Sequence, residues 1–328
     1  MACYNRLGIS ERSAQRFLGI SLFAGIYGLD DRDRAWFGDC RAVRKNSRIS
    51  ARPARWVAAS LCAAAYLAAA SAHPASAQGK LEAQYEASLA GIPVGRGAWN
   101  VEIGDDSYAA AASGGTTGLL KTIANGSGTG AAQGRVVNGA LVPQAYQAST
   151  RTSKKSETIH ITLANGNVKE YGIEPEPPVD ADRIPVTDAH KKGVFDPMTS
   201  SLLRVPGNGE VLSPDACRAG AAVFDGRMRY DLKLDFKRME TVKADKGYHG
   251  PAVVCAVYFT PIAGYIPDRP VIKYLAGQRH IEIAFVPIVG TRILVPFRMV
   301  IPTPLGTAML EATSFVTQAT PPHVAKTQ

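Results

Sequence analysis

Apolar and polar residues alternate along much of this chain, and this period-two pattern restricts the fold more than any other feature. Between residues 230 and 236 the alternation is complete, with apolar side chains at Tyr230, Leu232, Leu234 and Phe236. Such a pattern is typical of a strand with one buried face and one solvated face. Other alternating runs cover residues 81–89, 97–103, 157–163, 279–289 and 292–301.

The connections between these runs are short and rich in turn residues. Asp105-Asp106 follows one run and Asn165-Gly166 follows another, and connections of this length join antiparallel neighbours. Glycines crowd residues 113–134, but no Gly-Lys-Ser/Thr follows them, so we interpret them as sheet curvature rather than a phosphate-binding loop. We predict an all-β fold: a single, mostly antiparallel, strongly curved sheet of half-barrel or open-barrel type.

One short helix is predicted from Asp196 onward. Asp196 suits the N-cap and Pro197 the first helical position. This helix could plug one open end of the sheet, whose concave face must be filled by side chains, by the helix or by a ligand. The residues that could line that face are Met198, Leu202, Leu203, Tyr258, Phe259, Tyr265, Ile283, Phe285 and Phe297, and ordinary core packing is the alternative for each of them.

The first 77 residues are interpreted as a leader. Residues 43–77 combine a basic region, an alanine-rich apolar run and Ala75-Ser76-Ala77, as in a secretory signal peptide. Residues 1–42 are an extension, explained by a misassigned translation start near Val43 or by disorder. The mature domain is expected at 78–320, with a flexible tail at 321–328. Export through such a leader predicts a periplasmic protein that is not integral to the membrane after cleavage.

Most of the positive charge belongs to this leader. The whole chain has a net charge of +9, but residues 78–328 hold only 26 basic and 23 acidic side chains. A nearly balanced chain has no electrostatic basis for binding nucleic acid. We therefore expect no nucleic-acid partner.

Two cysteines remain after residue 77, Cys217 and Cys255. An even pair in an oxidising compartment predicts a disulfide. Two buried free thiols or a metal pair are the alternatives, but no histidine lies at ligand spacing from either cysteine. We expect no metal and no cofactor.

Among the sequence motifs, Asp225-Gly226-Arg227 is the strongest candidate for contact with a ligand. Arg227 could serve as a fork-like donor to an anionic headgroup. The alternative is a hairpin turn whose arginine pairs with Asp231 or Asp235 across the sheet. The candidate ligand-binding residues are Asp225, Arg227, Tyr230, Met198, Leu202, Tyr258 and Phe285.

No catalytic signature is present in the sequence. A nucleophile elbow and a zinc-binding His-Glu-x-x-His helix are both missing, and the histidines are scattered. Asp225, His280 and Glu282 could converge only through folding. We assign no catalytic residues and regard an enzyme as the less favoured reading.

Several short motifs together resemble a known family. They are Tyr85-x-x-Ser88-Leu89-x-Gly91-Ile92-x-Val94-Gly95, Phe195-Asp196-Pro197, Val223-Phe224-Asp225-Gly226-Arg227 with Tyr230-Asp231-Leu232, and the cysteine ahead of Pro261-Ile262-Ala263-Gly264. In order and spacing they are similar to domain of unknown function 3108, found in exported bacterial proteins. The resemblance covers roughly residues 80–318. It implies a periplasmic β-rich domain and brings no assigned activity.

These observations favour a non-catalytic envelope protein that binds an apolar or amphipathic, lipid-like ligand in the concave face of its sheet. A structural adaptor that acts through envelope protein partners is the first alternative. An unrecognised envelope hydrolase is the second.

Overall fold

The computed structural model describes residues 78–118, 121 and 125–320. The predicted leader, its extension and the tail from residue 321 lie outside the described residues. In the part that is described, no helix is both long and apolar enough to cross a membrane.

The described residues form 15 strands and a few short helices. The first seven strands are β1 (Gly79–Leu89), β2 (Ile92–Ile103), β3 (Ser107–Thr116), β4 (Gly126–Val137), β5 (Ala140–Thr152), β6 (Ser156–Ala164) and β7 (Asn167–Glu174). The others are β8 (Leu203–Arg204), β9 (Gly220–Phe224), β10 (Arg229–Lys243), β11 (Lys246–Gly247), β12 (His249–Ala263), β13 (Glu282–Pro287), β14 (Ile293–Thr303) and β15 (Gly306–Ala319). The helices are α3 (Pro197–Ser200) and α4 (Pro270–Gly277), with 3₁₀ turns η3 (Asp188–Lys191) and η4 (Pro214–Cys217).

All of these strands belong to one sheet; its main path has the order β7-β6-β5-β4-β3-β2-β1-β15-β14-β13-β12-β10-β9, with β8 paired to β14 and β11 to β15 beside it. The pairing is antiparallel except for the two-residue strand β11, which runs parallel to β15. The first strand pairs with the last, Leu81 opposite Thr317, and so joins the two halves. The ends of the order, β7 and β9, are not paired with each other, so the sheet stays open. The predicted all-β, mostly antiparallel, open sheet is confirmed.

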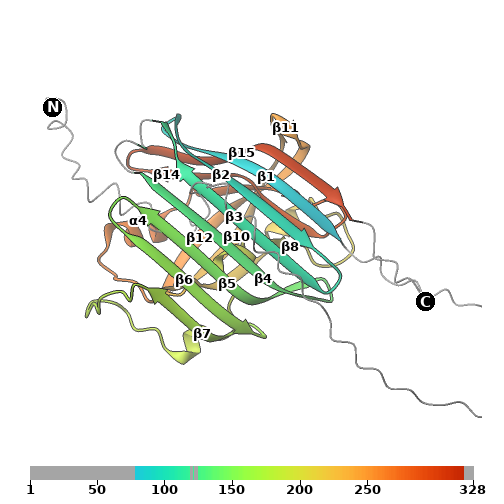
Figure 1. The fold of residues 1–328 in the computed structure, drawn as a ribbon. Helices are drawn as coiled ribbons and strands as arrows, with labels where there is room; N and C mark the ends of the chain where they lie inside the picture. The colour runs from blue at the N-terminus through green and yellow to red at the C-terminus, as the bar shows by residue number, and fades with distance from the viewer. Residues whose placement is uncertain (1–77, 119–120, 122–124, 321–328) are drawn as a thin grey trace, which may run out of the picture. The chain divides into compact units, whose positions relative to one another are not determined.

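The sheet folds over onto itself. Figure 1 shows β4 to β6 (green) passing in front of the later strands β10 and β12. Leu81 and Val101 from the first half share a buried core cluster with Val254 and Phe297 from the second. Burial of apolar surface between the two halves is the main term that holds the fold together.

One segment of chain bridges the open seam of the sheet. The Val194 amide donates to Gly166 O beside β7, at 2.8 Å, and the Phe195 amide donates to Ala222 O of β9, also at 2.8 Å. Phe195 also forms an isolated parallel bridge with Val223. Since α3 begins two residues later, this bridge fixes where the helix enters the interior.

The predicted helix start is confirmed. Asp196 Oδ1 accepts hydrogen bonds from the Met198 and Thr199 amides at 3.0 and 2.9 Å, and Pro197 occupies the first turn. A second helix, α4, was not predicted. It begins at Pro270 without a side-chain N-cap, so the usual capping signal is missing from the sequence.

The predicted alternation of β10 holds for Tyr230 and Leu234, which are buried, and fails at Phe236, which is 42% exposed. The register against β12 shifts between Phe236 and Arg238. Phe236 is therefore the last residue before a bulge, which adds a residue to one strand, disrupts the ladder and bends the strand at that point.

Cys217 and Cys255 lie at bonding distance, as predicted, with Cα atoms 5.5 Å apart. The bond ties η4 to β12, the central strand of the second half. Both cysteines are fully buried, in the cluster that also holds Val253 and Phe259. The bond therefore joins a turn-rich segment to the best-packed part of the sheet.

Candidate functional site

Two cavities lie against α3 in the interior of the folded sheet. The one on the side of β1–β3, which we call the inner cavity, has a volume of about 110 Å³ and is lined by residues such as Tyr85, Trp99, Ala112 and Met198. The one on the side of β8 and β9, the outer cavity, has a volume of about 250 Å³. Five residues belong to the walls of both: Ser200, Ser201, Leu232, Pro296 and Met299. The end of α3 thus stands between two adjacent apolar spaces.

The outer cavity has a buried end and an exposed end. Leu202 and Phe285 line its buried end, at 5% and 3% exposure. Arg204 and Gly220, also in its lining, are exposed. We call the exposed end, with Arg204 at its edge, the mouth.

Of the described residues that line the two cavities, Arg204 is the only Lys, Arg, Asp or Glu. Its Nη2 donates to Asn138 O in the β4–β5 turn at 3.0 Å. Among the ion pairs of the described residues, none involves Arg204. A cation therefore lies at the mouth of an apolar space, and no described residue pairs a carboxylate with it.

Two buried polar groups beside the inner cavity have unused hydrogen-bonding capacity in the described part of the chain. Trp99 lines this cavity, and its Nε1 has no hydrogen-bond partner. Asp196 is completely buried at the start of α3, and its Oδ2 has no partner either. Unsatisfied buried polar groups are uncommon in native proteins and call for an explanation.

Burial raises the pKa of Asp196 to about 6, because desolvation outweighs the hydrogen bonds from Thr199 and Met198 that favour the carboxylate. Its charge also reaches Tyr146 and Tyr230, which line the inner cavity. Burial and then the Asp196 charge raise the pKa of Tyr146. The deep end of the site therefore disfavours a second negative charge.

Four of the predicted ligand-binding residues line the cavities. Met198 and Tyr230 belong to the inner cavity, and Leu202 and Phe285 to the outer one. Their role in binding a ligand stays a prediction.

Tyr258 is not part of either cavity, contrary to its predicted place on the concave face. Its neighbour Val257 lines the outer cavity, and successive side chains of a strand point to opposite faces. Tyr258 instead lies beneath Lys233 Nζ and the Arg279 guanidinium, each 5.8 Å from the ring centroid. Phe297, also expected on the concave face, packs against the rings of Tyr248 and Phe315.

Asp225 and Arg227 form a turn, as in the alternative interpretation of that motif. Asp225 Oδ1 accepts hydrogen bonds from the Arg227 and Met228 amides at 2.8 and 2.6 Å. The Arg227 guanidinium donates to Glu157 of β6 at 2.9 Å, rather than to the predicted Asp231 or Asp235. Burial by itself would raise the pKa of Glu157. The hydrogen bonds and positive charges of Lys155 and Arg227 have the larger effect, so its pKa is lowered. Arg227 already has an anionic partner, so it is a poor candidate for binding a headgroup.

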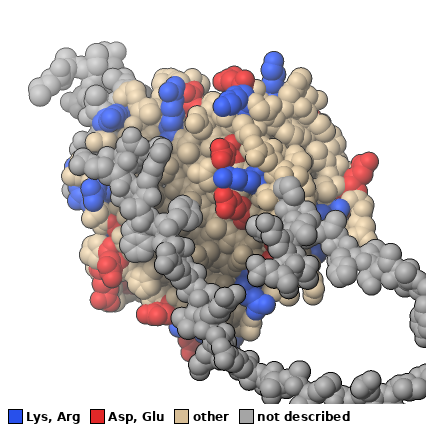
Figure 2. Space-filling model, turned by 45° about the vertical axis from the view of Figure 1, so that its right-hand side comes forward, with Lys and Arg blue, Asp and Glu red and all other residues tan. Residues whose placement is uncertain are grey.

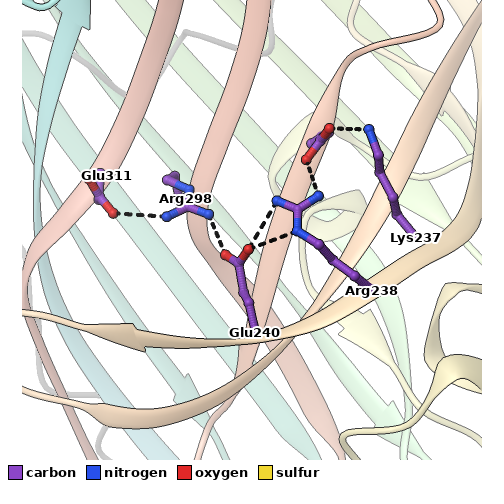
Figure 3. Close-up of polar contacts among 6 residues, drawn as sticks. Lys237, Arg238, Glu240, Arg298 and Glu311 are labelled. Atoms are coloured by element: carbon purple, nitrogen blue, oxygen red, sulfur yellow. Dashed lines mark hydrogen bonds and ion pairs between the residues drawn. The ribbon is translucent and has the colours of Figure 1, made fainter.

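Ion pairs cross the second half of the sheet on one face. Figure 3 shows Glu311, Arg298, Glu240 and Arg238 joined in series. Arg238 also pairs with Glu282, and Glu282 pairs with Lys237. In Figure 2 acidic and basic side chains are likewise interspersed on the face in view. Each charge in this series has an opposite neighbour, so the series presents no strong field of one sign.

Of the three residues that could have formed a hydrolytic site, Glu282 is held by Lys237 and Arg238, and Asp225 by its own turn. Glu282 lies on β13, whereas Asp225 lies in the turn between β9 and β10. The described part of the chain also contains no cluster of three metal-ligating side chains. The geometry therefore gives no support to hydrolysis at these residues.

The sequence matches the family described as "Protein of unknown function (DUF3108)" over residues 84–313. The chain belongs to this family. The match spans every element around the two cavities, from β1 to β15, and confirms the resemblance seen in the sequence motifs. The family description assigns no activity.

A comparison with solved structures adds a likeness of fold. No curated protein matches the sequence. A crystal structure described as a β-barrel-like protein of domain of unknown function DUF1849 from Brucella abortus is similar over 74% of this chain and 98% of that chain, with 11% identity and a TM-score of 0.40.

Proposed function

We propose that this protein is an exported, non-catalytic binding protein of the cell envelope, and that it holds an apolar or amphipathic, lipid-like molecule in the space beside α3. The observation that supports this proposal most strongly is the pair of adjacent, mostly apolar cavities between the strands of the folded sheet and α3. Ligand sites are concave, mostly apolar and largely preformed, with a few polar groups that orient the ligand.

The size of the space indicates a slender ligand. At about 110 and about 250 Å³, each cavity is smaller than the roughly 300–1,000 Å³ of usual small-molecule pockets. A single alkyl chain suits two narrow adjacent spaces better than a fused ring system or a two-chain lipid. The thioether side chains of Met198 and Met299 in the walls can adjust to such a chain.

The proposed envelope location rests on the sequence and on the cysteine pair. Residues 43–77 have the pattern of a secretory signal peptide. Cys217 and Cys255 lie at bonding distance, and disulfides persist mainly in oxidising compartments such as the periplasm.

Binding of a slender apolar fluorescent probe without fused rings, 1,6-diphenylhexatriene, tests this function. The variant Ala112→Met should fill the inner cavity, because Ala112 lines it. Ala111→Met on the same strand is the matched control, since Ala111 is exposed. We expect the unmodified protein and Ala111→Met to bind the probe alike and Ala112→Met to bind it at least tenfold more weakly, with circular dichroism unchanged.

Two outcomes would contradict the proposal. One is no probe binding by the unmodified protein after extraction of co-purified lipid. The other is equal binding by both methionine variants. Mass spectrometry of the lipid extract would identify what the protein carried.

A further inference from the structure

We propose that the ligand is a single-chain amphiphile with one terminal anionic group, that the anion is held by Arg204 at the mouth of the outer cavity, and that the chain extends inward along α3. This inference rests on the proposed function and deepens it, because it assigns the chemical class of the ligand and its orientation.

The first observation is the position of Arg204. It lines the outer cavity, is itself exposed, and has no carboxylate partner among the described residues, as set out above. A guanidinium presents five N–H donors in a planar fork that matches a carboxylate or a phosphate. The described contacts of Arg204 use one of its donors, on Asn138 O.

The second observation is the gradient of burial along the outer cavity. Its lining passes from exposed Arg204 through half-buried Leu203 and Ala221 to Leu202 and Val257, which are 5% and 3% exposed. Inward from Arg204 the lining carries no charge, and its polar side chains, Thr199, Ser200 and Ser201, have hydrogen-bond partners within the protein. A molecule with one charged end can satisfy both ends of this gradient only with its charge outward.

The third observation is the buried carboxyl group at the far end. Asp196 is fully buried where the two cavities meet α3: Pro197 and Met198 line the inner cavity, and Phe195 and Thr199 line the outer one. An anion placed deep in the site would lie near this group in a medium of low polarity, where repulsion between like charges is strong. Attraction at the mouth and repulsion at the deep end therefore orient the ligand in the same direction.

Displacement of 1,6-diphenylhexatriene by ligands with the same ten-carbon chain tests this inference. The ligands are decanoate, decyl phosphate and decanol, each used below its micelle concentration at pH 7.5. The variant Arg204→Gln removes the cation at the mouth. Arg151→Gln is the matched control, because Arg151 is an exposed residue of β5 outside the linings of both cavities and its loss changes the net charge equally.

We expect Arg204→Gln to bind decanoate roughly five- to tenfold more weakly, as for the loss of one charge-assisted contact, and to bind decanol within twofold of the unmodified protein. Arg151→Gln should bind all three ligands as the unmodified protein does. Tighter binding of decyl phosphate than of decanoate would indicate a lipid phosphate as the natural anion, and the reverse order a free fatty acid.

The inference is overturned if Arg204→Gln weakens decanol and decanoate equally, if Arg151→Gln has the same effect on decanoate, or if decanoate affinity does not depend on residue 204. All three of these results leave the proposed binding function intact. Failure of all three ligands to displace the probe from the unmodified protein would instead refute the proposed function.

Discussion

The buried carboxyl group of Asp196 lowers the stability of this protein as the pH rises from acidic to neutral values. Its pKa is raised from 3.8 to about 6, so the folded state binds a proton there more tightly than the unfolded state does. By linkage, protonation of Asp196 stabilises the fold fully below the unfolded pKa of 3.8, and this stabilisation is lost as the pH rises through about 6. Glu157 and Glu282 act in the opposite sense, because their pKa values are lowered in the folded state.

The substitution Asp196→Asn isolates this effect. An asparagine keeps a side-chain oxygen for the Met198 and Thr199 amides and caps a helix about as well as aspartate, but it does not titrate. The shift in pKa corresponds to roughly 3 kcal/mol in total, of which about 2 kcal/mol is lost between pH 4.5 and pH 7.5. Urea unfolding at both pH values should therefore show the variant gaining about 2 kcal/mol over the unmodified protein on going from pH 4.5 to pH 7.5.

The control is Asp196→Ala, which removes the cap as well as the charge. It should lack the helix-capping contribution, typically about 1 kcal/mol, at both pH values. If the free energies of unfolding of the unmodified protein and Asp196→Asn keep a constant difference between pH 4.5 and pH 7.5, the argument from burial is refuted.

Three further predictions concern the fold. Gly134→Ala should lower the free energy of unfolding in urea by about 2 kcal/mol or more, because a Cβ there would collide with backbone and ring atoms. Gly209→Ala, with open space around it, should change that free energy by less than about 0.5 kcal/mol. Equal effects of the two substitutions would contradict the crowding at Gly134. Arg298→Met should lower the free energy of unfolding by about 1 kcal/mol at low salt, because two glutamates lose their shared partner, and by less at 1 M NaCl. A loss that does not depend on salt would contradict an electrostatic origin. Replacing both Cys217 and Cys255 by serine should lower the free energy of unfolding by roughly 4 kcal/mol, because the bond closes a loop in the unfolded chain. Denaturation of the variant and of the oxidised protein measures this difference. An unchanged midpoint would show that the bond does not contribute.

Much of the fold was readable from local sequence. The alternation of Tyr230, Leu232 and Leu234 correctly indicated a strand with one buried face, because side-chain direction in a strand depends only on position along it. Asp196-Pro197 marked the start of α3 for a similarly local reason: the capping carboxylate and the amides that it binds are neighbours in the chain.

The rest depended on contacts between distant parts of the chain. Arg227 pairs with Glu157, 70 residues away, and nothing near either residue in the sequence indicates that partner. Arg204 belongs to a two-residue strand followed by Pro206 and Gly207, where no periodic pattern exists to place it. Trp99 could have drawn notice as a large aromatic residue in a predicted strand, but only the folded sheet shows that it lines a cavity.

The central claim, that a single-chain amphiphile occupies the space beside α3, is tested most directly by the methionine methyl signals of the protein. Met198 and Met299 line the inner cavity, while Met239 is 42% exposed and lies outside both linings. In ¹³C-methyl-methionine NMR, titration with decanoate should shift the Met198 and Met299 signals together with a common saturation and leave Met239 unchanged. Shifts confined to Met239, or no shift at Met198 and Met299 under saturating decanoate, would contradict the account.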